Sequence, residues 1–156
     1  MIREMNSADL DETARIWLDA NVEAHGFIPA EYWKKNFPMV KELLLQAEVY
    51  VYIDEVKNEV SGFIGLNENH IEGIFVKSSA RSAGIGKALL DFAKEKKEYL
   101  TLNVYQKNAR AVKFYEREGF AVEREGIDGE TGEKDFFMVS RRLSKVRPQT
   151  PGSAGI

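Results

Sequence analysis

Residues 74–90 read IFVKSSARSAGIGKALL, and this stretch decides the fold. Its apolar start is typical of the end of a strand. Its second half predicts a helix, because apolar residues at positions 85, 88, 89, 92 and 93 have the spacing of one buried face. Glycines at the start of such a helix leave backbone N–H groups uncovered, and these donors, with the positive end of the helix dipole, favour a bound phosphate or pyrophosphate. An ordinary glycine-containing turn is the alternative for so short a motif.

Two better-known phosphate-binding motifs do not match this loop. A P-loop has glycine five residues before its Gly-Lys pair and Ser or Thr after it, whereas this chain has Arg81 and Ala88 at those positions. The dinucleotide fingerprint has a third glycine or alanine where this chain has Leu89. What remains is Arg81-x-x-Gly84-x-Gly86 between a predicted strand and a predicted helix.

The composition limits the class of protein. The chain has 156 residues, 44% of them hydrophobic and 30% charged, which is typical of one globular domain. It has no cysteine and only two histidines, so we expect neither disulfides nor a metal site. No apolar run approaches membrane-spanning length and no charge-flanked apolar segment opens the chain, so we expect a cytoplasmic protein without a membrane partner. The net charge of −3 disfavours nucleic acid as a partner.

The predicted elements alternate between hairpin-linked strands and helices. We expect a capping box formed by Asp9 and Glu12 to begin the first helix, and Pro38 to kink or break the second. This order predicts the α+β class with a mixed sheet. Residues 1–143 would form one domain, and residues 144–156 a disordered tail or an expression remnant. Strands are predicted near residues 1–5, 49–53, 60–64, 70–76, 100–105, 120–124 and 134–142, and helices near residues 10–24, 30–45, 85–93 and 108–119.

A second motif in the C-terminal half reads NARAVKFYEREGF over residues 108–120. Together with Arg81-x-x-Gly84-x-Gly86 it resembles the GNAT acetyltransferase superfamily in order and spacing. Within the superfamily the chain is similar to small bacterial acetyltransferases of the YjaB type. The resemblance implies a single-domain GNAT fold with a mixed, mostly antiparallel sheet flanked by helices. It also implies that strands 70–76 and 100–105 splay apart where the pantetheine arm of acetyl-CoA pairs with strand backbone.

The resemblance implies an acetyl-CoA-dependent N-acetyltransferase in which the amine attacks the thioester directly. A non-catalytic acyl-CoA-binding or sensor domain on the same fold is the alternative, and an intact Tyr115 with a plausible base favours the enzyme. A tRNA- or ribosome-directed acylating enzyme is disfavoured by the acidic balance. The residues implied in binding acetyl-CoA are Ile74, Phe75, Val76, Arg81, Ser82, Ala83, Gly84, Ile85, Gly86, Lys87, Asn103, Asn108, Ala111, Phe114 and Tyr115.

Tyr115 matches the family position that protonates the departing CoA thiolate, and a phenol suits this role because it keeps its proton at neutral pH. The general base stays open between His70, Glu72 and neither. In a regular strand both side chains point to one face. We favour His70, because its unperturbed pKa of about 6.5 suits a base, whereas Glu72 would need a raised pKa or would only orient water. Asn103 would position the acceptor or a water molecule.

By resemblance the acceptor lies over the first two helices and the hairpin between the early strands. Trp17, Phe27 and Trp33 are the predicted substrate-binding residues, with Tyr32 and His25 as further candidates for the pocket wall. We interpret His25, beside a glycine in a predicted break, as a loop residue rather than a catalytic one. The partner would be a small-molecule or peptide amine, with polyamine, amino acid, antibiotic, peptide N-terminus and protein lysine all open. The protein would be a monomer or a homodimer.

Overall fold

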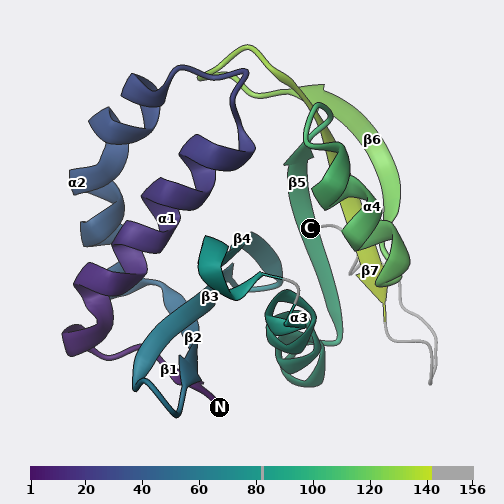
Figure 1. The fold of residues 1–156 in the computed structure, drawn as a ribbon. Helices are drawn as coiled ribbons and strands as arrows, with labels where there is room; N and C mark the ends of the chain where they lie inside the picture. The colour runs from purple at the N-terminus through teal and green to yellow at the C-terminus, as the bar shows by residue number, and fades with distance from the viewer. Residues whose placement is uncertain (82, 142–156) are drawn as a thin grey trace.

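Seven strands form one sheet in the computed structural model, which describes residues 1–81 and 83–141 (Figure 1). The strand order is β1-β2-β3-β4-β5-β7-β6, and every neighbouring pair is antiparallel except β4 and β5. The predicted α+β class with a mixed, mostly antiparallel sheet is therefore confirmed. The strands are β1 (Ile2–Glu4), β2 (Glu48–Asp54), β3 (Glu59–Asn67), β4 (His70–Val76), β5 (Tyr99–Tyr105), β6 (Ala121–Ile127) and β7 (Lys134–Arg141). The helices are α1 (Leu10–Ala24), α2 (Ala30–Gln46), α3 (Ile85–Lys96) and α4 (Ala109–Arg117), with short 3-10 turns η1 (Ser7–Asp9) and η2 (Ser78–Ala80).

Strands β4 and β5 separate soon after they meet. Their parallel register consists of two residue pairs, His70 with Thr101 and Ile71 with Leu102. Beyond these pairs β4 stays with β3 as far as Val76, and β5 stays with β7 as far as Tyr105. The predicted splay of the central strands is confirmed, and it leaves two strand edges facing each other across the middle of the sheet.

A β-bulge lies in β4 beside the splay. Leu66 of β3 pairs with Ile71 and the adjacent Gly65 pairs with Gly73, so that Glu72 is the extra residue. A bulge reverses the alternation of side chains beyond it. Ile71 and Ile74 accordingly pack into the same apolar cluster. The prediction that His70 and Glu72 point to the same face assumed a regular strand. Because of the bulge at Glu72, that assumption does not apply here.

Helices cover both faces of the sheet. Helix α3 buries Ile85, Leu89 and Ala93 of the predicted face in one cluster and packs Phe92 against it. Ala88 of that face is half-buried, and Leu90, which was not predicted, is buried as well. Leu89 and Leu90 are fully buried, and burial of such a side chain is worth about 1.5–3 kcal/mol. Helices α1 and α2 bury apolar residues against β2 and β3 in a second cluster. These two clusters hold α1 and α4 around the splay.

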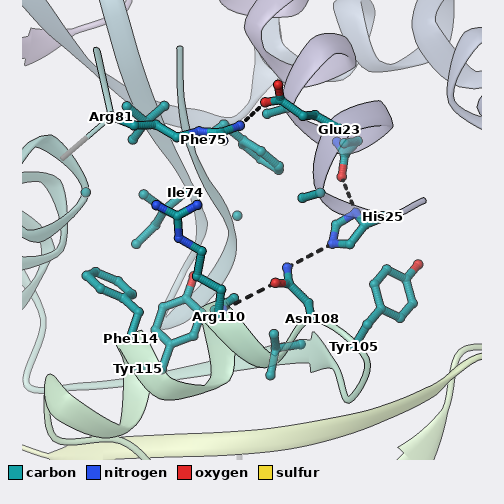
Figure 2. A pocket seen from close by; sticks show the side chains of 18 of the residues that line it. Glu23, His25, Ile74, Phe75, Arg81, Tyr105, Asn108, Arg110, Phe114 and Tyr115 are labelled. Carbon is teal, nitrogen blue, oxygen red and sulfur yellow. Dashed lines mark hydrogen bonds and ion pairs between the residues drawn. The ribbon is translucent and has the colours of Figure 1, made fainter. Parts of the chain in front are cut away.

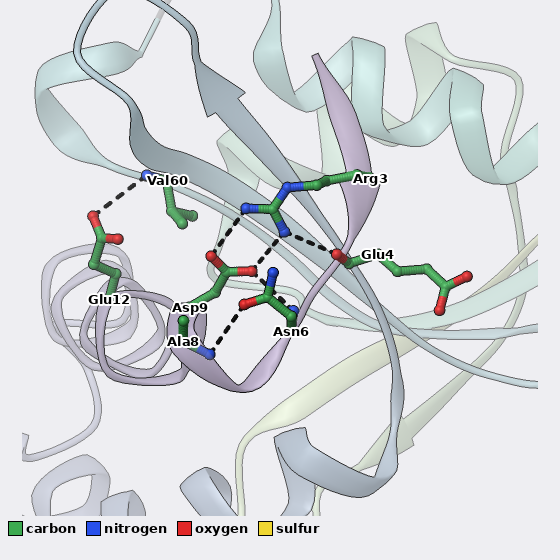
Figure 3. A network of polar contacts seen from close by, with 7 residues as sticks. All are labelled: Arg3, Glu4, Asn6, Ala8, Asp9, Glu12 and Val60. Carbon is green, nitrogen blue, oxygen red and sulfur yellow. Dashed lines mark hydrogen bonds and ion pairs between the residues drawn. The ribbon is translucent and has the colours of Figure 1, made fainter.

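The start of α1 differs from the sequence prediction (Figure 3). The capping box lies one turn earlier, on η1, where the Asn6 side chain accepts an N–H two residues ahead at 3.0 Å and Asp9 accepts the Asn6 N–H at 2.9 Å. The prediction that Asp9 and Glu12 form the capping box of α1 is therefore wrong. The reason is that Asp9 instead pairs with the Arg3 guanidinium at 2.7 Å, while Glu12 accepts the Val60 N–H of β3 at 3.4 Å.

Helix α2 continues through Pro38, so the predicted break at this residue is wrong. Trp33 before the proline and Leu44 after it are both buried, and this packing on either side holds the two halves in one helix. Arg142 of the predicted last strand, the end of the predicted domain at Leu143 and the predicted tail 144–156 lie outside the described residues.

Candidate active site

A cleft of about 1060 Å³ opens between the splayed strands and is bordered by α1, the start of α3, and α4 (Figure 2). Most of the residues predicted for the site line it. Among the described residues that were predicted, His70, Ala83, Phe27 and the further candidate Tyr32 do not contribute to this lining, and Ser82 is not described. The predicted residues that line the cleft are Trp17, Trp33, Glu72, Ile74, Phe75, Val76, Arg81, Gly84, Ile85, Gly86, Lys87, Asn103, Asn108, Ala111, Phe114 and Tyr115.

The start of α3 is built to leave backbone donors free. Gly84 precedes the helix with φ +78°, the left-handed conformation that side chains disfavour, and no side chain caps the first turn. A Cβ on Gly84 would meet no atom within 4 Å, so the backbone angle rather than crowding explains the glycine. The unpaired N–H groups and the helix dipole suit an anion such as a pyrophosphate.

The two cations of this loop already have partners. Arg81 forms an ion pair with Glu23 near the end of α1 (Figure 2). Lys87 lies 3.2 Å from both Asp91 and Glu118. Hydrogen bonds to Glu118 and Asp91 raise the pKa of Lys87, so it remains charged. Both cations face carboxylates in this structure, so among the described residues of the loop the backbone N–H groups are the donors that stay free.

Tyr115 lies on α4 and is 8% exposed. Its ring packs edge-on against Phe114 and Phe120, at 5.2 and 5.5 Å between centroids. Burial raises the pKa of the Tyr115 phenol, so the hydroxyl keeps its proton at neutral pH. Figure 2 shows this hydroxyl directed from α4 into the pocket, and no described residue forms a hydrogen bond with it. The arrangement presents a proton donor to whatever occupies the cleft.

Asn108 is held from two sides. It caps α4, because its Oδ1 accepts the Ala111 N–H at 3.3 Å, and its Nδ2 lies 3.1 Å from His25 Nε2. On the other side of the ring, His25 Nδ1 lies 3.0 Å from Asn21 Oδ1 on α1. Burial lowers the pKa of His25 to about 4, so the neutral ring donates from Nδ1 to Asn21 and accepts at Nε2 from Asn108. His25 thereby connects α1 to α4 across the cleft.

We expect this contact to produce a measurable pH dependence of stability. Unfolded histidine has a pKa of about 6.5, and that of folded His25 is about 4. Between these values the unfolded state binds more protons, so the stabilisation is complete above about pH 6.5 and is lost as the pH falls. The melting-temperature difference between wild type and His25→Gln should therefore narrow from pH 7 to pH about 4. A difference that stays constant would show that His25 does not carry this proton linkage.

The two candidates for the general base occupy different places. Glu72, at the bulge, is exposed and lines the cleft. His70 lies where β4 and β5 are still paired, with Nδ1 2.7 Å from Thr101 Oγ1 and its ring stacked on Phe137 at 6.3 Å. Burial lowers the pKa of His70, and the charge of Glu72 partly opposes this shift. Both residues remain predictions for the base, but only Glu72 faces the cleft.

Negative charge from the β6–β7 hairpin and aromatic rings from α1 and α2 also line the cleft. Asp128 and Asp135 line the cleft together with Asn103, and Tyr105 Oη donates to Asp128 at 2.7 Å. Burial and the charge of Asp128 raise the pKa of Asp135. Trp17 and Trp33 meet edge-on at 5.8 Å between ring centroids in the same lining.

Two other aromatic candidates for the pocket wall lie outside the lining. Phe27 packs against His25 at 5.6 Å between ring centroids, and the Tyr32 hydroxyl donates to Glu130 at 2.7 Å.

The cleft also contains residues that the sequence motifs did not single out. They include Asp128, Asp135 and Arg110, whereas His25 was a candidate for the pocket wall and was interpreted as a loop residue. None of them stands at a position that the motifs fix. Within residues 1–81 and 83–141, no three acidic or histidine side chains gather closely enough to hold a metal ion. In the same part of the chain, no helix is long and apolar enough to cross a bilayer.

Comparison with known proteins adds a family match and two similar enzymes. Residues 19–132 match the family described as acetyltransferase (GNAT) domain. The chain is 34% identical over 123 residues to peptidyl-lysine N-acetyltransferase YiaC of Escherichia coli K12, covering 78% of this chain and 84% of YiaC. It is 31% identical over 121 residues to peptidyl-lysine N-acetyltransferase YjaB of the same organism, covering 78% of this chain and 82% of YjaB.

Solved structures share the fold. The solution structure of apo YjaB from Escherichia coli matches with a TM-score of 0.80 and 27% identity, over 89% of this chain and 95% of that chain. The structure of YncA from Salmonella typhimurium, which contains acetyl-CoA, matches with a TM-score of 0.63 over 97% of this chain and 98% of that chain. At 17% identity the likeness to YncA concerns the fold alone.

Proposed function

Because the chain belongs to the GNAT acetyltransferase family, we propose that it acetylates the side-chain amine of lysine in a peptide or protein. The chain is an N-acetyltransferase, and acetyl-CoA is its co-substrate. The observation that carries the proposal is a single cleft in which an uncapped helix N-terminus, a protonated phenol and several carboxylates come together. Anion-binding donors, a general acid and a site for a cationic amine are the parts that acetyl transfer to lysine requires.

We assign the donor side of the cleft to the loop before α3, to β4 and to Asn108. The free N–H groups at the start of α3 would bind the pyrophosphate. The edge of β4 at Ile74–Val76, unpaired with β5 because of the splay, would bind the pantetheine arm through its backbone. Asn108, fixed by His25, would offer its amide to the same arm.

The proposed reaction has one acid and one base. The acceptor ammonium loses a proton to Glu72, directly or through water, and the nitrogen then attacks the thioester carbonyl carbon. As the C–N bond forms and the C–S bond breaks, Tyr115 gives its proton to the thiolate and regains one from solvent, while the nitrogen releases its second proton. Asn103 would orient the acceptor or the water. His70 is the alternative base, acting from the paired end of β4 and β5.

The choice of lysine rests on charge and on similarity. Glu72, Asp128 and Asp135 place carboxylates in a lining that also holds two tryptophans, which suits an alkyl chain that ends in an ammonium. Two similar proteins, YiaC and YjaB, are peptidyl-lysine N-acetyltransferases by name. A small free amine is the other acceptor class that these carboxylates would admit.

The test is an acetylation assay with matched peptides. We expect acetyl-CoA and a lysine peptide with a blocked N-terminus to give CoA release and a mass increase of one acetyl group on the lysine. The same peptide with acetyl-lysine in place of lysine should give neither. Acetylation of free amines without acetylation of the peptide would show that the acceptor is a small amine and not a peptide lysine. Calorimetric binding of acetyl-CoA with no turnover on any peptide or amine would favour the sensor alternative.

A further inference from the structure

Helix α4 presents three cations to the cleft. Arg110, Lys113 and Arg117 are spaced i, i+3 and i+7, which places them on one helix face. All three are exposed and all three line the cleft. Figure 2 shows the Arg110 side chain projecting from α4 into the pocket toward Ile74. We call these three residues the α4 basic stripe.

The stripe lacks the partners that other cations of the cleft have. Arg81 pairs with Glu23, and Lys87 pairs with Asp91 and Glu118. Within the described part of the chain, no carboxylate forms an ion pair with any member of the α4 basic stripe. Like charges at i, i+3 and i, i+4 destabilise a helix, and this chain carries more acidic than basic residues. An unpaired basic row that faces a cleft is therefore expected to meet an anionic ligand.

The stripe lies beside the start of α3. A Cβ on Gly86 would lie 3.8 Å from Phe114 Cζ of α4. Lys87 of α3 lies 3.2 Å from Glu118, the residue that follows Arg117. A ligand whose pyrophosphate rests on the α3 N-terminus therefore has its next anionic group within the reach of α4.

CoA has such a group. Besides its pyrophosphate it carries a phosphomonoester on the 3′ oxygen of the ribose, and a phosphomonoester bears nearly two negative charges at neutral pH. Neutral N–H donors suffice for a pyrophosphate, whereas a dianionic phosphate is bound most strongly by Arg and Lys. We infer that the α4 basic stripe is the subsite for the 3′-phosphate of CoA, and that it makes the enzyme discriminate against dephospho-CoA. The inference rests on the acetyl-CoA dependence stated above.

The test compares Kd values for CoA and dephospho-CoA by calorimetry, and kcat/KM for their acetyl thioesters. We expect wild type to bind CoA about 10–100-fold more tightly, the usual effect of hydrogen bonds to a charged group. In each of the variants Lys113→Gln and Arg117→Gln, the Kd for dephospho-CoA divided by the Kd for CoA should be about tenfold lower than in wild type. Arg15→Gln removes an exposed arginine of α1 outside the cleft, and this matched control should keep the wild-type ratio. Melting temperatures confirm that each variant is folded.

Four outcomes would overturn the inference. Equal Kd values of wild type for CoA and dephospho-CoA would show that the protein makes no favourable contact with the 3′-phosphate. If the variants lost affinity equally for CoA and dephospho-CoA, the stripe would bind the pyrophosphate or would act only through its overall positive charge. A change confined to the KM of the peptide would assign it to an acidic segment of the acceptor, and binding of neither ligand would remove the subsite together with the donor. A retained ratio without any acetylated peptide would instead leave the subsite standing and contradict only the proposed acceptor.

Discussion

Tyr115→Phe is expected to lower kcat by about 10²–10⁴-fold, the usual contribution of one general acid, while the Kd for acetyl-CoA stays near that of wild type. The substitution keeps the ring that packs between Phe114 and Phe120 and removes only the hydroxyl. Because no described residue forms a hydrogen bond with that hydroxyl, its loss leaves no protein partner unsatisfied. Single-turnover and steady-state rates with a lysine peptide, together with calorimetry for acetyl-CoA, measure the two effects separately.

A matched control for this variant is Tyr52→Phe. Tyr52 packs at the edge of the same apolar cluster but does not line the cleft, so its phenol should be dispensable for turnover. Near-full activity of Tyr115→Phe with the lysine peptide would mean that solvent protonates the thiolate. A parallel loss of activity and of melting temperature would indicate a packing defect instead, because Tyr115 is almost fully buried.

The local parts of the site were predictable from the sequence because they are encoded locally. The spacing of apolar residues fixed α3, and Gly84 at a left-handed backbone angle fixed the loop before it. The 108–120 motif likewise predicted a helix that carries Tyr115, and both Asn108 and Tyr115 line the cleft. Each of these features depends on residues that are close in the chain, which is where periodicity, capping preference and glycine conformation act.

The remaining features depend on partners that are distant in the chain. His25 bonds Asn108 across 83 positions, and no local pattern indicates that contact. The bulge at Glu72 follows from the register between two strands, so the alternation of β4 alone could not reveal it. Asp9 fits a capping box at the start of α1, yet its carboxylate pairs with Arg3 of β1. In each case tertiary packing determines the outcome among several arrangements that the local sequence permits.

Glu72→Gln is expected to lower kcat/KM by about 10²-fold or more, because it removes the proposed base while keeping the size of the side chain. Glu72 is exposed in the cleft lining, and a glutamine at this position should not disturb the bulge. His70→Asn is the matched comparison: its amide can replace Nδ1 in the bond to Thr101 but cannot titrate. We expect that variant to stay within a few-fold of wild type. Rates with the lysine peptide from pH 5 to pH 9 measure both effects.

The pH dependence decides between the two residues. If His70 were the base, it would have to lose its proton before it could act, so the rate would rise with pH through its pKa. Burial lowers that pKa, which places this rising limb below the usual range for histidine. In His70→Asn the limb would disappear and turnover would collapse, and Glu72→Gln would remain active. That result would assign the base to the paired end of β4 and β5, whereas full activity of both variants would leave proton removal to water.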